Sequence, residues 1–323
     1  MVAVDVCGEE EGVARARVAV CVITYNRPQG LVRLLEGLDR QTFTGLAPAV
    51  EIVVVDNDPA GSACVLLEET NPVRNWPLRC YVEARRGIPQ ARNAAISNLE
   101  GGVDFVAFVD DDEVPVPRWL DELLRVQREH EADAVAGTVL RYFDQPPPDW
   151  ILRGRFFEKR RYRTGQPVKY VDTANSLVRR ELFEGQDKPF DERLAFSGGE
   201  DTHFFLRAHR DGRKMVWADG AVVHELIPRS RTSAGWVFRR AYRLGNSLAF
   251  CEADLDPSPS VLALRAAKAL ARIARGLLLV PVSPLLGGRH ALARALHEVF
   301  RGAGMLAGLA GFTHEEYKKT HGS

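Results

Sequence analysis

Short apolar runs and helical spacings alternate along the first third of the chain. Each apolar run ends in polar residues, as expected for a strand that is buried on both faces of a sheet. Between the runs, apolar residues recur three and four positions apart, as at Leu31, Leu34, Leu35 and Leu38. The pattern predicts strands at 18–23, 51–55, 78–82 and 103–109, with helices around 31–38, 62–70 and 87–99.

This alternation predicts an α/β fold with a mostly parallel sheet that helices cover on both faces. In such sheets, ligands bind beyond the carboxyl ends of the strands. Three of the predicted strands end in polar residues that can bind or react, at 24–26, 56–58 and 110–112. We expect these strand ends to converge on one ligand site.

The fourth predicted strand is followed at once by four consecutive carboxylates, Asp110 to Glu113. Adjacent negative charges repel one another, and a divalent cation is the usual compensation. Mg²⁺ and Mn²⁺ prefer carboxylate oxygens and often share them with the phosphates of a substrate. For an isolated cluster, the alternative is a solvated turn or the start of the helix predicted after Pro117. The convergence of the other strand ends favours a metal with a phosphorylated ligand.

The chain has 323 residues, 46% of them hydrophobic, and a net charge of zero. Its length suits one large domain with an appendage, or two domains, and its charge gives no indication of nucleic-acid binding. Three sequence motifs are missing: a Gly-x-Gly-x-x-Gly fingerprint after the first strand, a P-loop and a Gly-x-Ser-x-Gly elbow. A dinucleotide site, a P-loop enzyme and an elbow-type hydrolase are therefore disfavoured.

The five cysteines, Cys7, Cys21, Cys64, Cys80 and Cys251, are scattered and include no Cys-x-x-Cys pair. This distribution argues against a disulfide framework or a zinc site and suits a reducing cytosol. The acidic N-terminal segment does not resemble a signal peptide, and no uninterrupted apolar stretch reaches the ~18 residues of a membrane span. We expect a cytoplasmic protein, with a peripheral position at the inner face of the cell membrane as the alternative.

Five short motifs follow one another along the chain. They are Thr-Tyr-Asn-Arg-Pro at 24–28, Val-Val-Asp-Asn at 54–57, Ala-Arg-Asn-Ala at 91–94, Phe-Val-Asp-Asp-Asp-Glu at 108–113 and Gly-Glu-Asp-Thr-His-Phe at 199–204. In this order they resemble the inverting, nucleotide-sugar-dependent glycosyltransferases of family 2, which have the GT-A fold. Within that family, the pattern is similar to bacterial succinoglycan-type exopolysaccharide glycosyltransferases. The resemblance runs from about residue 18 to about residue 225.

The resemblance implies three regions. Residues 1–17 would be a flexible N-terminal tail. Residues 18–255 would be a GT-A catalytic domain, with a Rossmann-like nucleotide-sugar half at about 18–115 and an acceptor half at about 116–255. Residues 256–323 would be a basic, amphipathic helical region. The implied function is transfer of a sugar from a nucleotide diphosphate sugar to an acceptor hydroxyl, in bacterial polysaccharide or glycoconjugate synthesis.

The resemblance also assigns the nucleotide to the first half of the chain. It implies that Tyr25 stacks on the base, since an aromatic face suits a flat heterocycle, and that Asp56 accepts the imide hydrogen of a uracil, which favours a UDP-sugar. Arg92 would lie near the phosphates, with Arg85 and Arg86 as alternatives. The residues implied for the whole nucleotide site are Thr24, Tyr25, Arg27, Asp56, Arg92, Asp110 and Asp111.

For the metal and the catalytic base, the resemblance points to separate carboxylates. Asp112 would be the principal ligand of Mg²⁺ or Mn²⁺, and Asp110 would lie near the metal or the ribose. His224 would be a third ligand, unless the backbone satisfies it. Asp201 would be the single general base of an in-line, inverting attack. Glu200 is its competitor, because adjacent residues on a helix point about 100° apart and only one can face the acceptor.

The acceptor pocket is expected in the second half of the chain. Asn175, Glu200 and Trp119 are the residues that we expect to contact the sugar or the acceptor. His203 is expected on a helix face near the site. The segment from Arg153 to Lys169 carries seven basic residues and one acid, a local charge of +6. It is either a solvated loop or a surface that attracts a diphosphate-bearing acceptor or an anionic membrane.

A second basic region lies near the C-terminus. Arg265, Lys268, Arg272 and Arg275 recur at helical spacing, and residues 257–312 contain seven basic residues and one acid. A basic amphipathic helix of this kind suits a membrane surface. If the acceptor is linked to a polyprenyl diphosphate in the membrane, contact of residues 261–310 with the membrane would bring the enzyme to it. The alternatives are packing on the catalytic domain or a homodimer interface.

Two other classes of protein remain as alternatives to an inverting hexosyltransferase. A sugar-phosphate nucleotidyltransferase would need a Gly-rich loop with an arginine after the first strand. This chain has Thr-Tyr-Asn-Arg-Pro at that place, residues 24–28, with no glycine. A non-catalytic sugar-nucleotide-binding protein would be expected to lack the base or the metal pair, yet Asp110, Asp112 and Asp201 are all present. Neither alternative fits the sequence as well.

Overall fold

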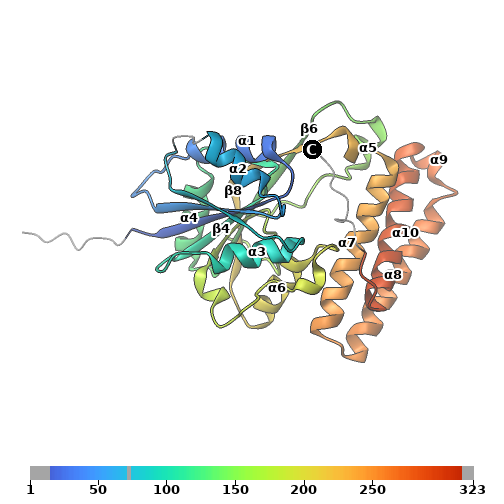
Figure 1. Ribbon diagram of the computed structural model, residues 1–323. Helices are drawn as coiled ribbons and strands as arrows, with labels where there is room; N and C mark the ends of the chain where they lie inside the picture. Colours follow the sequence, from blue (N-terminus) through green and yellow to red (C-terminus); the bar gives the residue numbers. More distant parts are fainter. Residues whose placement is uncertain (1–14, 71–73, 315–323) are drawn as a thin grey trace, which may run out of the picture.

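The computed structural model describes residues 15–70 and 74–314. These residues form one central sheet with helices on both faces, and a group of helices at one end of the sheet (Figure 1). The strands are Arg17–Thr24 (β1), Ala49–Asp56 (β2), Leu78–Val82 (β3), Phe105–Val109 (β4), Glu113–Pro115 (β5), Ala134–Phe143 (β6), Asn175–Arg179 (β7) and Met215–Ile227 (β8). Their order in the sheet is β3-β2-β1-β4-β7-β6-β8-β5.

The sheet is mostly parallel, which confirms the expected α/β fold. β1 pairs in parallel with β2 and β4, and β2 pairs in parallel with β3, so the four predicted strands form one parallel half. In the other half, β6 and β8 are parallel, while β7 is antiparallel to β4 and β6 and β5 is antiparallel to β8. The parallel half brings the carboxyl ends of β1, β2 and β4 to the same edge.

Helices cover both faces of the sheet because successive strand residues point to opposite sides. Val20 packs in one core cluster with Leu34 and Leu120, whereas its neighbour Cys21 packs in the other with Phe204. In Figure 1, α1 and α2 lie above the sheet and α3 and α6 lie below it. The helices beside the sheet are Pro28–Asp39 (α1), Ser62–Thr70 (α2), Ile88–Ser97 (α3), Trp119–His130 (α4), Asp149–Gly154 (α5) and Glu200–Arg210 (α6), with 3-10 turns at Arg180–Phe183 (η1), Glu192–Leu194 (η2) and Arg229–Arg231 (η3).

Four further helices follow the last strand: Ala234–Leu255 (α7), Pro259–Leu279 (α8), Ser283–Leu286 (α9) and Arg289–Leu309 (α10). They stand together at one end of the sheet (Figure 1), with α10 packed against both α7 and α8. Glycines make this packing close: a Cβ on Gly304 would collide with the backbone of Tyr242, and one on Gly245 with the backbone of Arg301. Among the helices described, none has the length and apolarity needed to cross a bilayer.

The basic stripe predicted on α8 is partly used inside the protein. Arg265 pairs with Glu252 of α7 at 2.5 Å, and Arg272 pairs with Glu298 of α10 at 2.7 Å. For these two arginines, packing against neighbouring helices describes the structure better than a free membrane-facing stripe does.

One expectation about the first part of the chain needs correction. Cys64 of α2 and Cys80 of β3 form a disulfide, with Cα atoms 5.5 Å apart, so the prediction of no disulfide was wrong. Their separation in sequence gave no sign that α2 would lie against β3. The predicted N-terminal tail, 1–17, lies outside the described residues except for its last three, and Arg17 already begins β1.

Candidate active site

A cavity of about 1350 Å³ opens at the carboxyl ends of the parallel strands. The strand ends contribute Tyr25, Asn57 and the cluster from Asp110 to Glu113. The first turn of α6 contributes Asp201, and helices α7 and α10 close the far side. The convergence expected from the sequence is therefore found in the structure.

Asp111 is a buried anchor within the acidic cluster. The hydroxyl of Thr24 donates to one of its carboxylate oxygens at 2.8 Å, and Arg27 donates to the other at 2.9 Å. The same Arg27 nitrogen lies 3.0 Å from Asp112. Thr24 and Asp111, both expected in the nucleotide site, thus bind each other at the cavity wall. Their contribution is to fix the loop that carries Asp112.

Arg92 links the cluster to the predicted base region. It is buried, forms an ion pair with Glu200, and lies 3.4 Å from Asp110. Arg92 therefore lines the cavity between two acids. Of its two alternatives, Arg86 lines the cavity, whereas the exposed Arg85 pairs with Glu83 and Glu192 outside it.

A third arginine, which the sequence did not single out, completes the charge arrangement. Arg231, from the turn after β8, lies 3.2 Å from Asp112 and 3.1 Å from Glu225. Glu225 also accepts from Arg141 at 2.6 Å. The contacts of Glu225 with Arg141 and Arg231 could not be predicted from the sequence, because they depend on the pairing of β6 with β8.

The arginines do not cancel the negative charge of the cluster. Burial, opposed by Arg92 and reinforced by Asp112, raises the pKa of Asp110 to about 7. Burial also raises the pKa of Asp111 to about 6 against the effect of Arg27, and it raises the pKa of Glu113 well above its usual range. The protein thus holds several carboxylates where their ionised forms are disfavoured. A divalent cation would relieve that cost.

The side chains of Asp110 and Asp112 are those that a cation could reach. They are 36% and 23% exposed and both line the cavity. Carboxylate oxygens are the donors that Mg²⁺ and Mn²⁺ prefer. These residues fit the expected metal site.

His224 does not join this pair. Side chains alternate across β8, and its neighbour Glu225 lines the cavity, so His224 lies on the opposite face of the strand, where its ring contacts Tyr142. The structure therefore does not support His224 as a third metal ligand.

The two acids at the start of α6 have different surroundings. Glu200 is 3% exposed and is occupied by Arg92. Asp201 faces the cavity and accepts from the backbone N–H of Thr202 at 2.6 Å. Burial, followed by the neighbouring charge of Asp172, raises the pKa of Asp201. A carboxylate with a raised pKa is a stronger base, so Asp201 is better suited than Glu200 to take a proton.

The end of the cavity where the sequence predicts the nucleotide differs in detail from that prediction. The guanidinium of Arg86 stacks over the ring of Tyr25 at 4.5 Å, on an aromatic face that was expected to take the base. Asp56 is fully buried and accepts the backbone N–H groups of Asp58 and Ala63 at 3.0 and 2.6 Å. The strand end contributes Asn57, rather than Asp56, to the cavity lining.

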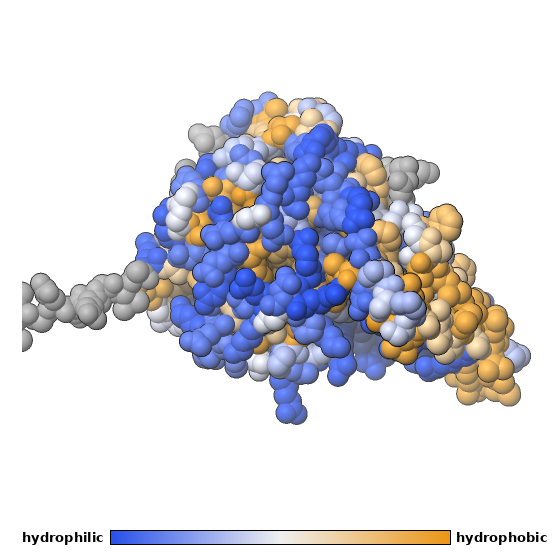
Figure 2. All heavy atoms as spheres, turned by 90° about the horizontal axis from the view of Figure 1, so that it is seen from below, coloured by the Kyte–Doolittle hydropathy of each residue, from blue (hydrophilic) through white to orange (hydrophobic). Residues whose placement is uncertain are grey.

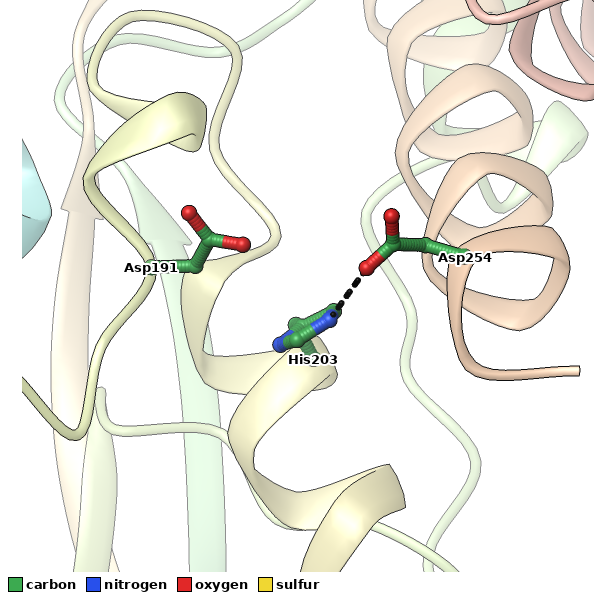
Figure 3. A group of neighbouring side chains, drawn as sticks. All are labelled: Asp191, His203 and Asp254. Carbon is green, nitrogen blue, oxygen red and sulfur yellow. Dashed lines mark hydrogen bonds and ion pairs between the residues drawn. The ribbon is translucent and has the colours of Figure 1, made fainter. Parts of the chain in front are cut away.

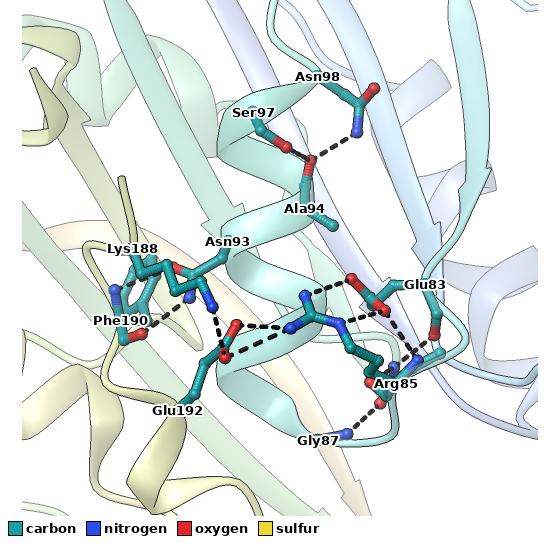
Figure 4. Close-up of polar contacts among 11 residues, drawn as sticks. Glu83, Arg85, Gly87, Asn93, Ala94, Ser97, Asn98, Lys188, Phe190 and Glu192 are labelled. Atoms are coloured by element: carbon teal, nitrogen blue, oxygen red, sulfur yellow. Dashed lines mark hydrogen bonds and ion pairs between the residues drawn. The ribbon is translucent and has the colours of Figure 1, made fainter. Parts of the chain in front are cut away.

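Helix α3 fixes the loops on both sides of the site (Figure 4). The Asn93 side chain donates to the backbone carbonyl of Phe190 at 2.8 Å and accepts its N–H at 2.9 Å. In the loop that precedes α3, Arg85 joins Glu83 to Glu192. Arg92 and Asn93 together thus hold the segment that leads to Asp201, which explains why they occur side by side.

Two residues expected in the acceptor pocket have structural roles. Trp119 is fully buried in the core and its indole N–H donates to Asn175 at 2.7 Å. The amide nitrogen of Asn175 donates to the backbone of Thr138 and Ala221 at 3.0 and 2.9 Å. The prediction for Trp119 is therefore wrong, and Asn175 joins three strands although it borders the cavity.

His203 belongs to a separate polar group with Asp191 and Asp254 (Figure 3). Its Nε2 lies 3.0 Å from Asp254, while Nδ1 has no partner among the described residues. One His and two carboxylates could hold a metal, but Arg193 already bridges both acids, at 2.6 Å from Asp191 and 2.7 Å from Asp254. We interpret this group as a set of ion pairs that stabilises the packing of η2, α6 and α7 against one another.

Comparison with known sequences identifies relatives over most of the chain. The model of the family described as glycosyl transferase family 2 matches residues 19–185. The chain is 33% identical to the succinoglycan biosynthesis protein ExoM of Rhizobium meliloti (strain 1021) over 226 residues. These aligned residues cover 70% of this chain and 72% of ExoM. It is 27% identical to the glucosyl-dolichyl phosphate glucuronosyltransferase of Haloferax volcanii, over 72% of this chain and 76% of that one.

Solved structures share the same fold. The mannosyltransferase PcManGT from Pyrobaculum calidifontis, in complex with GDP-Man and Mn²⁺, has a TM-score of 0.60 at 22% identity, over 91% of this chain and 88% of that one. TarS 1-349 of S. aureus in complex with UDP has a TM-score of 0.50 at 19% identity, over 92% of each chain.

Proposed function

The chain belongs to glycosyl transferase family 2, and on that premise we propose that it is an inverting glycosyltransferase. It would move one sugar from a nucleotide diphosphate sugar, with a UDP-sugar preferred, to an acceptor hydroxyl. The observation that carries this proposal is that Asp201 lines the same cavity as Asp110 and Asp112. A base for the acceptor and a site for the leaving diphosphate are the two parts that the reaction needs.

In the proposed reaction, the acceptor oxygen attacks the anomeric carbon as the bond to the diphosphate breaks. The acceptor proton passes to the carboxylate of Asp201, and the leaving electron pair remains on the diphosphate oxygen. No covalent intermediate forms, so the anomeric centre inverts. The raised pKa of Asp201, caused by burial and then by Asp172, supports this role. Glu200 is less suited because it is engaged by Arg92.

We propose that Asp110 and Asp112 hold a divalent cation, Mg²⁺ or Mn²⁺. When bound, the cation would neutralise charge on the leaving diphosphate. Arg27 contacts both Asp111 and Asp112, and Arg231 contacts Asp112 and Glu225, so these arginines orient the carboxylates toward the cavity. They also add positive charge beside the leaving group, which stabilises it.

The substrate classes are proposed from the relatives. The name of ExoM records succinoglycan biosynthesis, which supports a role in exopolysaccharide synthesis with a saccharide acceptor. TarS binds UDP and PcManGT binds GDP-Man in their structures. The nucleobase of the donor must therefore be identified by experiment. We retain the UDP-sugar on the family resemblance at Tyr25, which lines the cavity. Asp56, the other residue that the resemblance implied, is buried and bonded to the backbone, so it adds no support.

We also propose that the protein contacts a membrane peripherally, through the tip between α8 and α10. Four leucines there, Leu277, Leu278, Leu285 and Leu286, are 57–88% exposed. Figure 2 shows apolar side chains gathered on this helical end of the molecule, while the rest of that face is mostly polar. Exposed apolar residues next to a basic helix suit a lipid surface. A homodimer through the same tip is the alternative.

A screen of donor hydrolysis tests the proposal. UDP-, GDP- and dTDP-sugars are each incubated with Mn²⁺, Mg²⁺ or EDTA, and the released nucleotide is measured. We expect release from one nucleotide class, with metal only. Binding of a sugar nucleotide without turnover in any condition would favour a non-catalytic binding protein, and release of pyrophosphate from a nucleoside triphosphate and a sugar phosphate would favour a nucleotidyltransferase.

A further inference from the structure

A second part of the cavity lies along α10. On this helix, His290, Arg294, His297 and Arg301 follow one another at spacings of four, three and four residues, and all four line the cavity. Residues at these spacings share one face of a helix. One face of α10 thus presents a continuous basic stripe to the cavity.

Other elements add positive charge to the same end. Arg240 and Arg243 of α7 and Arg275 of α8 also line the cavity. The acid that α10 contributes to the cavity lining, Glu298, is engaged by Arg272 at 2.7 Å. Arg301 forms no ion pair with any residue in the described part of the chain. This basic end of the cavity thus includes one arginine, Arg301, without a carboxylate at ion-pair distance among the described residues.

The titration of this stripe agrees with an excess of positive charge. Burial, and then the charge of Arg301, lowers the pKa of His297 to about 4. Burial, and then Arg272, lowers the pKa of Arg301, whereas the acids around Arg27 raise its pKa despite burial. Burial and Arg272 disfavour the charged form of Arg301, and Glu298 offsets them only in part, so an anion bound there would stabilise its guanidinium.

Helix α7 connects this end to the predicted base. Its Ser247 donates to the backbone of Ser197 at 3.4 Å, and its Cys251 lies 3.4 Å from the carbonyl oxygen of Gly199, on the loop that leads to Asp201. Arg243 and Arg240 lie one and two turns before Ser247. The basic end is thus on the base side of the site, which is the side of the acceptor.

We propose that the basic end, formed by Arg294, His297 and Arg301 with Arg240 and Arg243, binds a phosphate or diphosphate group that the acceptor carries. The inference rests on the proposed function, since it assumes that the acceptor enters beside Asp201. Guanidinium groups bind phosphate oxygens in pairs of hydrogen bonds, so arginines on two facing helices suit a diphosphate. The donor diphosphate has its own site at Asp110 and Asp112, and this anion site is separate from it.

Binding of inorganic pyrophosphate in the presence of EDTA tests the inference, because chelation removes any metal-dependent binding at the acidic end. We expect the wild-type protein to bind pyrophosphate in calorimetry. The double variant Arg294→Gln/Arg301→Gln should bind it at least about tenfold more weakly. Arg289→Gln, an exposed position on the same helix that does not line the cavity, is the matched control and should bind as the wild type does.

The same proteins distinguish the possible sources of the phosphate. Their sedimentation with vesicles of phosphatidylcholine and phosphatidylglycerol should be unchanged by the double substitution. Absence of pyrophosphate binding by the wild type, an equal loss in Arg289→Gln, or a loss of vesicle binding with pyrophosphate binding retained would overturn the inference. Donor hydrolysis should survive in the double variant, which confirms folding. Failure of donor hydrolysis in the wild type would instead contradict the proposed function.

Discussion

At the scale of single residues, the site depends on how neighbouring acids are separated. Glu200 and Asp201 are adjacent in sequence, but Arg92 occupies the first, and the second faces the cavity. Asp111 and Asp112 differ in exposure: Thr24 and Arg27 hold the buried Asp111, whereas Asp112, which Arg27 and Arg231 also contact, is 23% exposed. In each pair, one acid stabilises the loop and leaves the other for chemistry.

The raised pKa of Asp201 predicts an acidic limit on activity. A base must be deprotonated, so activity should fall as the pH drops through the raised pKa, above the usual value of 3.8. Donor hydrolysis is measured across pH at saturating Mn²⁺, because a bound cation keeps Asp110 ionised. An acid limb at or below about pH 4 would contradict the environment described for Asp201.

The buried ion pair between Arg92 and Glu200 predicts a large stability effect. Arg92→Met would leave the Glu200 carboxylate buried without a partner, which costs about 3–5 kcal/mol of the free energy of unfolding. Urea denaturation measures the loss. Arg85→Met, which removes an exposed arginine from the same region, is the control and should change stability little. Equal effects of the two substitutions would show that the buried pair is not important.

At the scale of elements, glycines decide how the C-terminal helices assemble. Gly304 of α10 lies against the backbone of Tyr242 of α7, and Gly245 of α7 lies against Arg301 of α10. These close contacts bring the basic face of α10 next to Arg243 and so form the far wall of the cavity. The packing of two helices thus determines the shape of this wall of the cavity.

Substituting Gly304 by alanine tests this packing. In an unconstrained helix the change would stabilise by about 1 kcal/mol, but here the added Cβ meets the backbone of Tyr242 and should cost about 1–3 kcal/mol. Thermal unfolding should shift to lower temperature. Gly235→Ala, at an exposed position of α7 with room for a Cβ, should be neutral or stabilising. A stabilised Gly304→Ala protein would refute the close approach of the helices.

At the scale of the whole molecule, the cavity changes character along its length. Its acidic end lies at the strand ends, Asp201 borders it on α6, and its basic end lies against α10. Beyond the basic end come the exposed leucines of the helical tip. This order suits a donor that enters at the sheet and an acceptor that reaches the site from a lipid surface.

Vesicle binding tests the role of the tip. Leu278→Gln/Leu285→Gln removes two of its most exposed apolar side chains and should weaken sedimentation with anionic vesicles about tenfold or more. Leu46→Gln, which changes a leucine that is 65% exposed in the loop before β2, should have no effect. If both proteins sediment like the wild type, the tip does not contact lipid. A change in oligomeric state in the tip variant alone would assign it to a dimer interface.

The sequence predicted those features that short local patterns of residues specify. The first four strands, the acids from Asp110 to Glu113 and Asp201 are all signalled by local patterns, and the structure brings these acids to one cavity. Contacts between distant segments were not visible. The disulfide of Cys64 depends on how α2 packs, and the face on which His224 lies depends on the pairing of β8. Such features require the tertiary arrangement, which residue spacing alone does not contain.

The central claim is that one group of carboxylates serves the leaving group and a separate one activates the acceptor. Binding and hydrolysis of the preferred sugar nucleotide, measured side by side for Asp112→Asn and Asp201→Asn with Mn²⁺, test it most directly. We predict that Asp112→Asn loses nucleotide affinity, whereas Asp201→Asn keeps near-wild-type affinity and loses turnover by at least about a hundredfold. Retained turnover in Asp201→Asn, or unchanged metal-dependent binding in Asp112→Asn, would contradict this account.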